Sequence, residues 1–255
     1  MSRIFRTFII FLLLLTSRNA IAITVDTKPV KPTYDFRQIV SNDLDSLLAL
    51  QNTLGAAPQQ FSHDLDALFE RAPEAQSELS NLVTKISQQN QAYMIIPKIK
   101  SYQRAQQKIA LKFDGDASYL TDIARATIVT NDVASLMSAY KAIVAHAEVV
   151  QVKNRFATPK ASGYRDLNLL VKLPQSQMVA EVQLHLNKIA EIKSGPEHHV
   201  YEQIQHIELQ AQRQHRPVSE LELMQIVKLR QTSHKLYHKA WLSYKRQSLA
   251  ELQAA

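Results

Sequence analysis

Cysteine is absent from the 255-residue chain, and glycine occurs only four times. The lack of cysteine excludes disulfide bonds, thiol nucleophiles and thiolate metal ligands. The four glycines stand where we expect turns, and none belongs to a phosphate-binding loop of the P-loop or Rossmann kind: Gly55, Gly115, Gly163 and Gly195. Any phosphate group must therefore be bound by side chains.

A long apolar run is also missing, and the one short run lies near the N-terminus. Arg3 and Arg6 precede the apolar residues 8–15, and Ala20-Ile21-Ala22 follows as a small-residue cleavage site. The run is too short to span a membrane and is typical of a signal peptide over residues 1–22. We expect export to the periplasm or out of the cell, with no stable membrane span after cleavage. An uncleaved N-terminal anchor is the alternative.

A strong excess of positive charge is missing as well. The full chain carries a net charge of +7, and residues 1–22 contribute three arginines and no acid, so their removal lowers it to +4. Proteins that bind nucleic-acid backbones usually show a large clustered excess of lysine and arginine. The balance favours a local anion-binding pocket and does not favour a nucleic-acid surface.

The period of apolar residues divides the rest of the chain. Residues 23–34 hold two prolines and no period, which indicates a linker. Residues 35–93 show helical spacing, with Ser62 and Pro73 as expected starts of a second and a third helix. Helical spacing returns beyond Asn187, where we expect two long helices broken near Arg216-Pro217, and residues 203–255 form a C-terminal helical extension.

The middle of the chain is rich in β-branched residues. Four runs predict strands, and a helical pattern over residues 133–146 separates the first two runs. The order strand, helix, strand, hairpin, strand predicts an α+β fold, with a mixed β-sheet of about four to five strands flanked by helices. The four runs are residues 126–130, 148–152, 167–173 and 178–184.

Basic residues recur every four positions after Pro97, a residue suited to the first turn of a helix. The recurring residues are Lys100, Arg104, Lys108 and Lys112, with Lys98 beside them. No acid occurs between residues 92 and 113, although like charges four apart destabilise a helix. The segment therefore indicates an anionic ligand, and a solvated basic face is the alternative.

Two acids and one turn complete the candidate site. Asp122 stands ahead of one predicted strand, and Glu181 lies inside an apolar one, where a carboxylate is costly unless it is paired, protonated or bound to metal. Together they could hold Mg²⁺, although a strand glutamate can also simply face solvent. Tyr164, in the turn 159–168, could stack on a base or serve plain packing.

Four segments in this order resemble the synthetase domain of the RelA/SpoT family, from about Lys98 to Tyr201. The family patterns Arg-x-Lys-Ser-x-x-Ser-x-x-x-Lys, Asp-Ile-Ala-Gly-Ile-Arg-Ile-Val, Pro-Lys-x-Asn-Gly-Tyr-x-Ser-Leu-His and Glu-Val-Gln-Ile-Arg-Thr are similar to residues 98–108, 122–129, 159–168 and 181–186. The chain departs from them at three arginine positions, now Lys98, Thr127 and His185, and also at Ser162 and Asn168.

The resemblance implies a nucleotidyltransferase-like core over residues 94–202 and an ATP-dependent diphosphotransferase, similar to GTP/GDP pyrophosphokinases. Such an enzyme moves pyrophosphate from ATP to the 3′-hydroxyl of a purine nucleotide. Asp122 and Glu181 would bind Mg²⁺ and, with Gln183, form the catalytic group. The ATP-binding residues would be Lys98, Lys100, Arg104, Lys108 and Arg125, and the acceptor-binding residues Lys160, Ser162, Tyr164, Asn168 and His185.

The changed arginines keep a second hypothesis open, namely a catalytically degenerate module that binds a nucleotide or a partner protein. A third hypothesis keeps the reaction and changes the acceptor to an adenine nucleotide or an RNA end. Export combined with ATP chemistry suggests an effector or toxin that acts where ATP is present. His198, His199, Tyr201 and Glu202 could border the acceptor site. The sequence predicts no oligomeric state.

Overall fold

A five-stranded mixed sheet organises the computed structural model, which describes residues 36–254. The strand order is β1-β2-β5-β4-β3. β2 and β5 run parallel, whereas β1 is antiparallel to β2, and β4 is antiparallel to both β5 and β3. The strands are β1 (Tyr93–Ile95), β2 (Arg125–Thr130), β3 (Glu148–Asn154), β4 (Leu167–Lys172) and β5 (Val179–Leu186).

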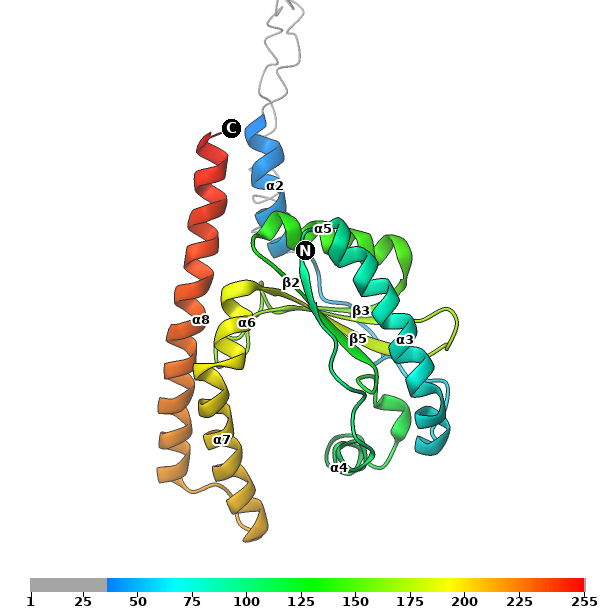
Figure 1. Cartoon of the computed structure of the whole chain (residues 1–255). Coiled ribbons are helices and arrows are strands. Elements are labelled where there is room, and N and C mark those ends of the chain that lie inside the picture. Colours follow the sequence, from blue (N-terminus) through cyan, green and yellow to red (C-terminus); the bar gives the residue numbers. More distant parts are fainter. Residues whose placement is uncertain (1–35, 255) are drawn as a thin grey trace, which may run out of the picture. The chain divides into compact units, whose positions relative to one another are not determined.

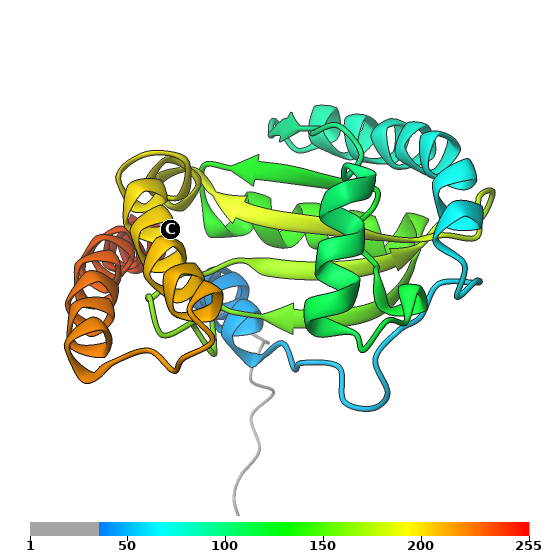
Figure 2. The same cartoon turned by 90° about the horizontal axis from the view of Figure 1, so that it is seen from below.

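Seven α-helices surround the sheet in this part of the chain. α3 and α5 cover one face, α4 lies across the other, and α6, α7 and α8 stand at one end of the strands (Figures 1 and 2). The helices are α2 (Phe36–Ala49), α3 (Leu65–Gln89), α4 (Tyr102–Lys112), α5 (Val133–His146), α6 (Asn187–Ser194), α7 (Pro196–Arg213) and α8 (Glu220–Ala254). The α+β fold expected from the sequence is confirmed.

The alternation of β5 explains how the sheet separates a core from a site. Ala180, Val182 and Leu184 are fully buried on the face covered by the core helices, because successive side chains of a strand point to opposite faces. Glu181 and Gln183 lie on the other face and are only half-buried. One face of the sheet therefore packs, and the other stays open to a ligand.

Two expected helix starts are wrong. Pro73 lies inside α3, which begins after its N-cap Asp64 and runs unbroken to Gln89. A continuous buried face, including Leu68, Leu79 and Val83, packs against the core on both sides of the proline and compensates for the one lost backbone hydrogen bond.

Pro97 does not begin the basic helix either. Ser101 caps α4 by accepting a hydrogen bond from the Arg104 N–H, so α4 starts at Tyr102. Lys98 and Lys100 therefore precede the helix, and the Lys100 N–H instead donates to the Ile123 carbonyl at 3.1 Å. The basic residues consequently do not all share one helical face.

The C-terminal region forms three helices rather than two, because Gly195 separates α6 from α7. The expected break near Arg216-Pro217 is confirmed, since α7 ends at Arg213 and α8 begins at Glu220. Within residues 36–254 no helix has both the length and the apolar character that crossing a membrane requires. The predicted signal peptide and linker lie outside the residues that the structure describes.

Candidate active site

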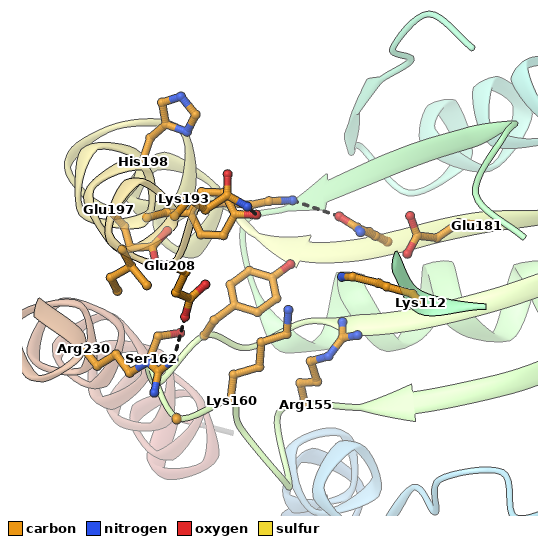
Figure 3. Close-up of a pocket in the computed structure, with 16 residues that line it drawn as sticks. Lys112, Arg155, Lys160, Ser162, Glu181, Lys193, Glu197, His198, Glu208 and Arg230 are labelled. Carbon is orange, nitrogen blue, oxygen red and sulfur yellow. Dashed lines mark hydrogen bonds and ion pairs between the residues drawn. The ribbon is translucent and has the colours of Figure 1, made fainter. Parts of the chain in front are cut away.

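A cavity of about 830 Å³ opens on the free face of the sheet, between the turn 160–164 and the helices α7 and α8 (Figure 3). β5 contributes Glu181 and Gln183, and the N-terminal part of α7 contributes Glu197, His198 and Tyr201. Basic side chains come from five other parts of the chain: Lys112, Arg155, Lys160, Lys193 and Arg230. The cavity therefore joins residues that lie far apart in the sequence.

Glu181 and Gln183 enter the cavity because they share the open face of β5. The Asn168 side-chain amide, one strand away, donates to Glu181 Oε1 at 2.6 Å. Lys193 Nζ, on α6, donates to Gln183 Oε1 at 2.9 Å (Figure 3). Each of the two predicted catalytic side chains on β5 is thus held by one hydrogen bond from a neighbouring element.

Tyr164 forms part of the cavity wall, and its hydroxyl is fixed from beneath. The hydroxyl donates to Asp166 Oδ2 at 2.8 Å and lies 2.7 Å from His185 Nε2. Because the tyrosine proton is used on Asp166, the His185 Nε2 must carry the proton that it shares with the tyrosine oxygen. Burial, followed by the Asp166 charge, raises the pKa of Tyr164. The ring is therefore neutral and rigidly placed.

Asp166 is fully buried and accepts two hydrogen bonds from Arg155 Nη1, at 2.7 and 2.9 Å. Burial alone would raise the pKa of Asp166, but the nearby His185 side chain, whose Nε2 lies 3.8 Å from Asp166 Oδ2, and the Arg155 charge outweigh it and lower the pKa. Burial also lowers the pKa of His185, which favours its neutral form. The buried negative charge beneath the cavity is therefore balanced mainly by Arg155.

Two lysines lie over the Tyr164 ring. The Nζ atoms of Lys160 and Lys193 are 5.2 and 5.7 Å from the ring centroid. Burial lowers the pKa of both lysines, and the nearby Arg155 charge lowers that of Lys160 further. An anion in the cavity would favour their charged forms. Stacking of a base on Tyr164 stays a prediction, and it requires these lysines to move aside.

Asp122 lies next to a different pair of lysines, ahead of β2. Its Oδ2 is 3.0 Å from Lys100 Nζ and 2.9 Å from Lys108 Nζ. Burial would raise the pKa of Asp122, but the hydrogen bond and charge of Lys108, and then Lys100, lower it. Its Oδ1 is buried and accepts no hydrogen bond from the residues that the structure describes.

Glu181 lines the cavity and Asp122 does not, but the two carboxylates come from neighbouring parts of the sheet and are of the kind that Mg²⁺ prefers. β2 and β5 are parallel neighbours, and the Glu181 N–H donates to the carbonyl of Ala124, two residues after Asp122. Mg²⁺ is usually bound by one or two carboxylates together with substrate phosphates, and it would satisfy the unpartnered Asp122 oxygen. Nowhere in residues 36–254 do three or more histidine, aspartate or glutamate side chains gather as a complete protein cage.

The other predicted residues divide between the cavity and the surface. Ser162 lines the cavity, and Asn168 and His185 lie beneath it as partners of Glu181 and Tyr164. Lys98 and Arg104 are exposed and do not line the cavity. Arg125 pairs in register with Glu181, and its buried Nε has no hydrogen-bond partner among the residues described.

Five charged residues of the cavity were not predicted from the sequence. Arg155 and Lys193 lie outside the matched motifs, and Glu197, Glu208 and Arg230 come from the C-terminal helices. Only the position of Arg155, just before the turn with Lys160, gave a local indication. His198 and Tyr201 do line the cavity as expected, whereas His199 and Glu202 do not.

Residues 90–206 match the family model described as "Region found in RelA / SpoT proteins". No curated protein matches the chain.

Several solved structures share the fold. The small alarmone synthetase 2 from Bacillus subtilis is 21% identical, with 71% of this chain and 98% of that chain covered and a TM-score of 0.51. The Bacillus subtilis small alarmone synthetase 1 bound to its product pppGpp is 16% identical, with 74% and 98% covered and a TM-score of 0.51. The Type VI effector Tas1, in complex with its immunity protein, is 20% identical, with 68% and 94% covered and a TM-score of 0.51.

Proposed function

This chain contains a RelA/SpoT domain over residues 90–206, and we propose on that premise that it transfers pyrophosphate from ATP to the 3′-hydroxyl of a purine nucleotide. The observation that carries the proposal is the cavity beside β5. It brings Glu181 and Gln183 together with Arg155, Lys160 and Lys193. Carboxylate, amide and cationic groups in one concave site suit a phosphorylated acceptor whose hydroxyl must be oriented for attack.

The acceptor binds in this cavity. Its phosphates contact the cationic side chains at the floor, and its base lies along the wall that Tyr164 forms, with Ser162 and Asn168 nearby. The acceptor's 3′-hydroxyl oxygen attacks the β-phosphorus of ATP, the bond between that phosphorus and the α–β bridging oxygen breaks, and AMP leaves. Glu181 accepts the hydroxyl proton, whereas Gln183 cannot act as a base and orients the acceptor. Lys193 supports this role by holding the Gln183 amide at 2.9 Å.

ATP binds on the side of Asp122, where Lys100, Lys108 and Arg125 supply positive charge next to β2. The Asp122 and Glu181 carboxylates would hold Mg²⁺, which would supply neutralisation of the phosphate charge. Lys98 and Arg104, which are exposed, contribute less to ATP binding than the basic residues next to β2.

The product class proposed is that of guanosine tetraphosphate, with an adenine nucleotide or an RNA end as the other acceptors to be tested. The fold of the small alarmone synthetases supports the first acceptor class. The predicted signal peptide and the fold shared with the effector Tas1 support a role as an exported effector or toxin. The target lies in a compartment that contains ATP.

A direct assay tests the function. The purified protein is incubated with ATP, Mg²⁺ and either GDP, GTP or adenine nucleotides, and products are separated by ion-exchange chromatography and identified by mass spectrometry. We expect a pyrophosphorylated nucleotide, lost with chelator and lowered at least about a hundredfold by Asp122→Asn or Glu181→Gln. Asp114→Asn, at an exposed aspartate outside the cavity, is the matched control and should keep full activity.

A catalytically degenerate binding module is the second candidate, and the changed arginine positions favour it. In that case purified nucleotides bind to the cavity, but no product forms with any acceptor. Equal product formation by the wild type and by Asp122→Asn would contradict the proposed roles of the carboxylates.

A further inference from the structure

Arg155 is anchored by only one of its three guanidinium nitrogens. Its Nη1 donates to both oxygens of Asp166, at 2.7 and 2.9 Å. Among the residues that the structure describes, none accepts a hydrogen bond from Nη2 or Nε. The side chain is 21% exposed and lines the cavity. The guanidinium is therefore fixed at its inner edge and free to donate at its outer edge.

The anchor itself is held by a buried network. The Tyr164 hydroxyl donates to Asp166 Oδ2 at 2.8 Å, and His185 Nε2 lies 2.7 Å from that hydroxyl. Asp166 is fully buried, and His185 is only 2% exposed. Hydrogen bonds in such a water-poor environment are strong and tolerate little displacement. The network therefore fixes the direction in which Arg155 points.

Arg155 and Lys160 direct their charged ends into the same part of the cavity (Figure 3). Their charges repel each other, and the Arg155 charge contributes to the lowered pKa of Lys160. Arg230, which lines the opposite wall, already pairs with Glu208 at 3.6 Å. Lys112, Arg155, Lys160 and Lys193 are the other cations that line the cavity, and Arg155 and Lys160 are the two directed into one part of it.

Two residues of the network that holds Arg155 differ from the family pattern. The family pattern has an arginine at position 185, where this chain has His185, and that histidine turns to the Tyr164 hydroxyl instead. Asp166 also replaces the serine of the family pattern. Both replaced residues contact the Tyr164 hydroxyl, and the network that they form supports the guanidinium of Arg155, which lies just after β3.

We propose that Arg155 binds the pyrophosphate group of the acceptor nucleotide, and that Asp166 positions Arg155 for this contact. A guanidinium with two free N–H directions matches the oxygens of a phosphate better than a lysine does. The inference rests on the proposed function only for the identity of the molecule that carries the pyrophosphate group. The anion site itself does not depend on catalysis.

The test uses the full-length protein and inorganic pyrophosphate, which has no base, measured by calorimetry at low salt. Arg155→Gln should weaken pyrophosphate binding by about tenfold or more, because a charge-assisted contact is lost. Lys153→Gln is the matched control: it removes one charge two residues before Arg155, at an exposed position of β3, and binding should change less than about twofold.

Arg155→Gln removes the charge partner of the buried Asp166, and this loss could unfold the protein. The double variant Arg155→Gln/Asp166→Asn removes both charges and should fold while binding pyrophosphate as weakly as the single variant. Asp166→Asn alone keeps the cation but loosens its placement, and it should weaken binding less than Arg155→Gln does. Arg155→Lys should restore part of the affinity.

Wild-type affinity in a folded Arg155 variant, or an equal loss in Lys153→Gln, would overturn the inference. Transfer of pyrophosphate from ATP is measured separately on the same proteins. Absence of transfer together with an Arg155-dependent affinity would refute the proposed function and leave the anion site standing. Pyrophosphate transfer by Arg155→Gln with an unchanged KM for the acceptor would support the proposed function and refute the role of Arg155.

Discussion

Two groups of lysines in this molecule face opposite electrostatic situations. Lys100 and Lys108 both contact Asp122, within 3.0 Å, and together they lower its pKa. Lys160 and Lys193 instead lie over the Tyr164 ring, and burial lowers their own pKa values. The first pair is neutralised by the protein itself, whereas the second pair lacks a carboxylate in contact. The comparison indicates that a bound anion would stabilise the charged lysines of the cavity more than those beside Asp122.

The largest expected effect comes from removing the lysines of Asp122. Lys100→Met/Lys108→Met leaves a mostly buried carboxylate without its partners, and it should lower the free energy of unfolding by about 3 kcal/mol. Chemical denaturation at neutral pH measures the loss. Lys98→Met, at an exposed position just ahead of Lys100, is the control and should change stability by less than about 0.5 kcal/mol. Equal effects in both proteins would mean that the Asp122 contacts contribute nothing.

Removing the cavity lysines should have a smaller and different effect. Lys160→Met/Lys193→Met takes away two cations whose lowered pKa shows that the fold disfavours their charge, so the stability should stay the same or rise. Affinity for GDP should fall by about tenfold, because two charged contacts to phosphate are lost. Calorimetry and denaturation on one preparation check both results. A loss of stability as large as that of Lys100→Met/Lys108→Met would show that the two groups of lysines do not differ in this way.

Local sequence patterns predicted the features of the fold that depend on residues close together in the sequence. The helix over residues 133–146 and the alternation that turns Glu181 and Gln183 to the open face both follow from periodicity. β1 could not be predicted in the same way, because its three residues are all exposed and show no alternation. The helix start expected at Pro73 was wrong because tertiary burial of α3 outweighs the helix-breaking tendency of proline.

Charged residues of the site were predictable only where a motif or, for Lys112, the four-residue basic spacing included them. Lys160, Ser162 and Tyr164 belong to one turn and reach the cavity together. Lys193 and Arg155 enter it from α6 and from the end of β3, and only the sheet order brings these elements close to that turn. Lys98, which spacing placed beside the basic helix, precedes α4 because the chain becomes helical only after Ser101. Arg104 lies within α4 but is exposed as well.

The smallest effect, and the most specific to the first lysine pair, is the acid dependence of Asp122. A carboxyl whose pKa is lowered in the folded state stabilises the protein above its ordinary pKa of 3.8, and this contribution is lost as the pH falls through the lower folded value. The stability gap between wild type and Asp122→Asn should therefore be constant near neutral pH and narrow below about pH 3.8, as urea unfolding can measure. In the Lys100→Met/Lys108→Met background the same replacement should instead raise stability, since it removes an unpaired buried charge. An unchanged sign in that background would show that the two lysines do not hold Asp122 in its ionised form.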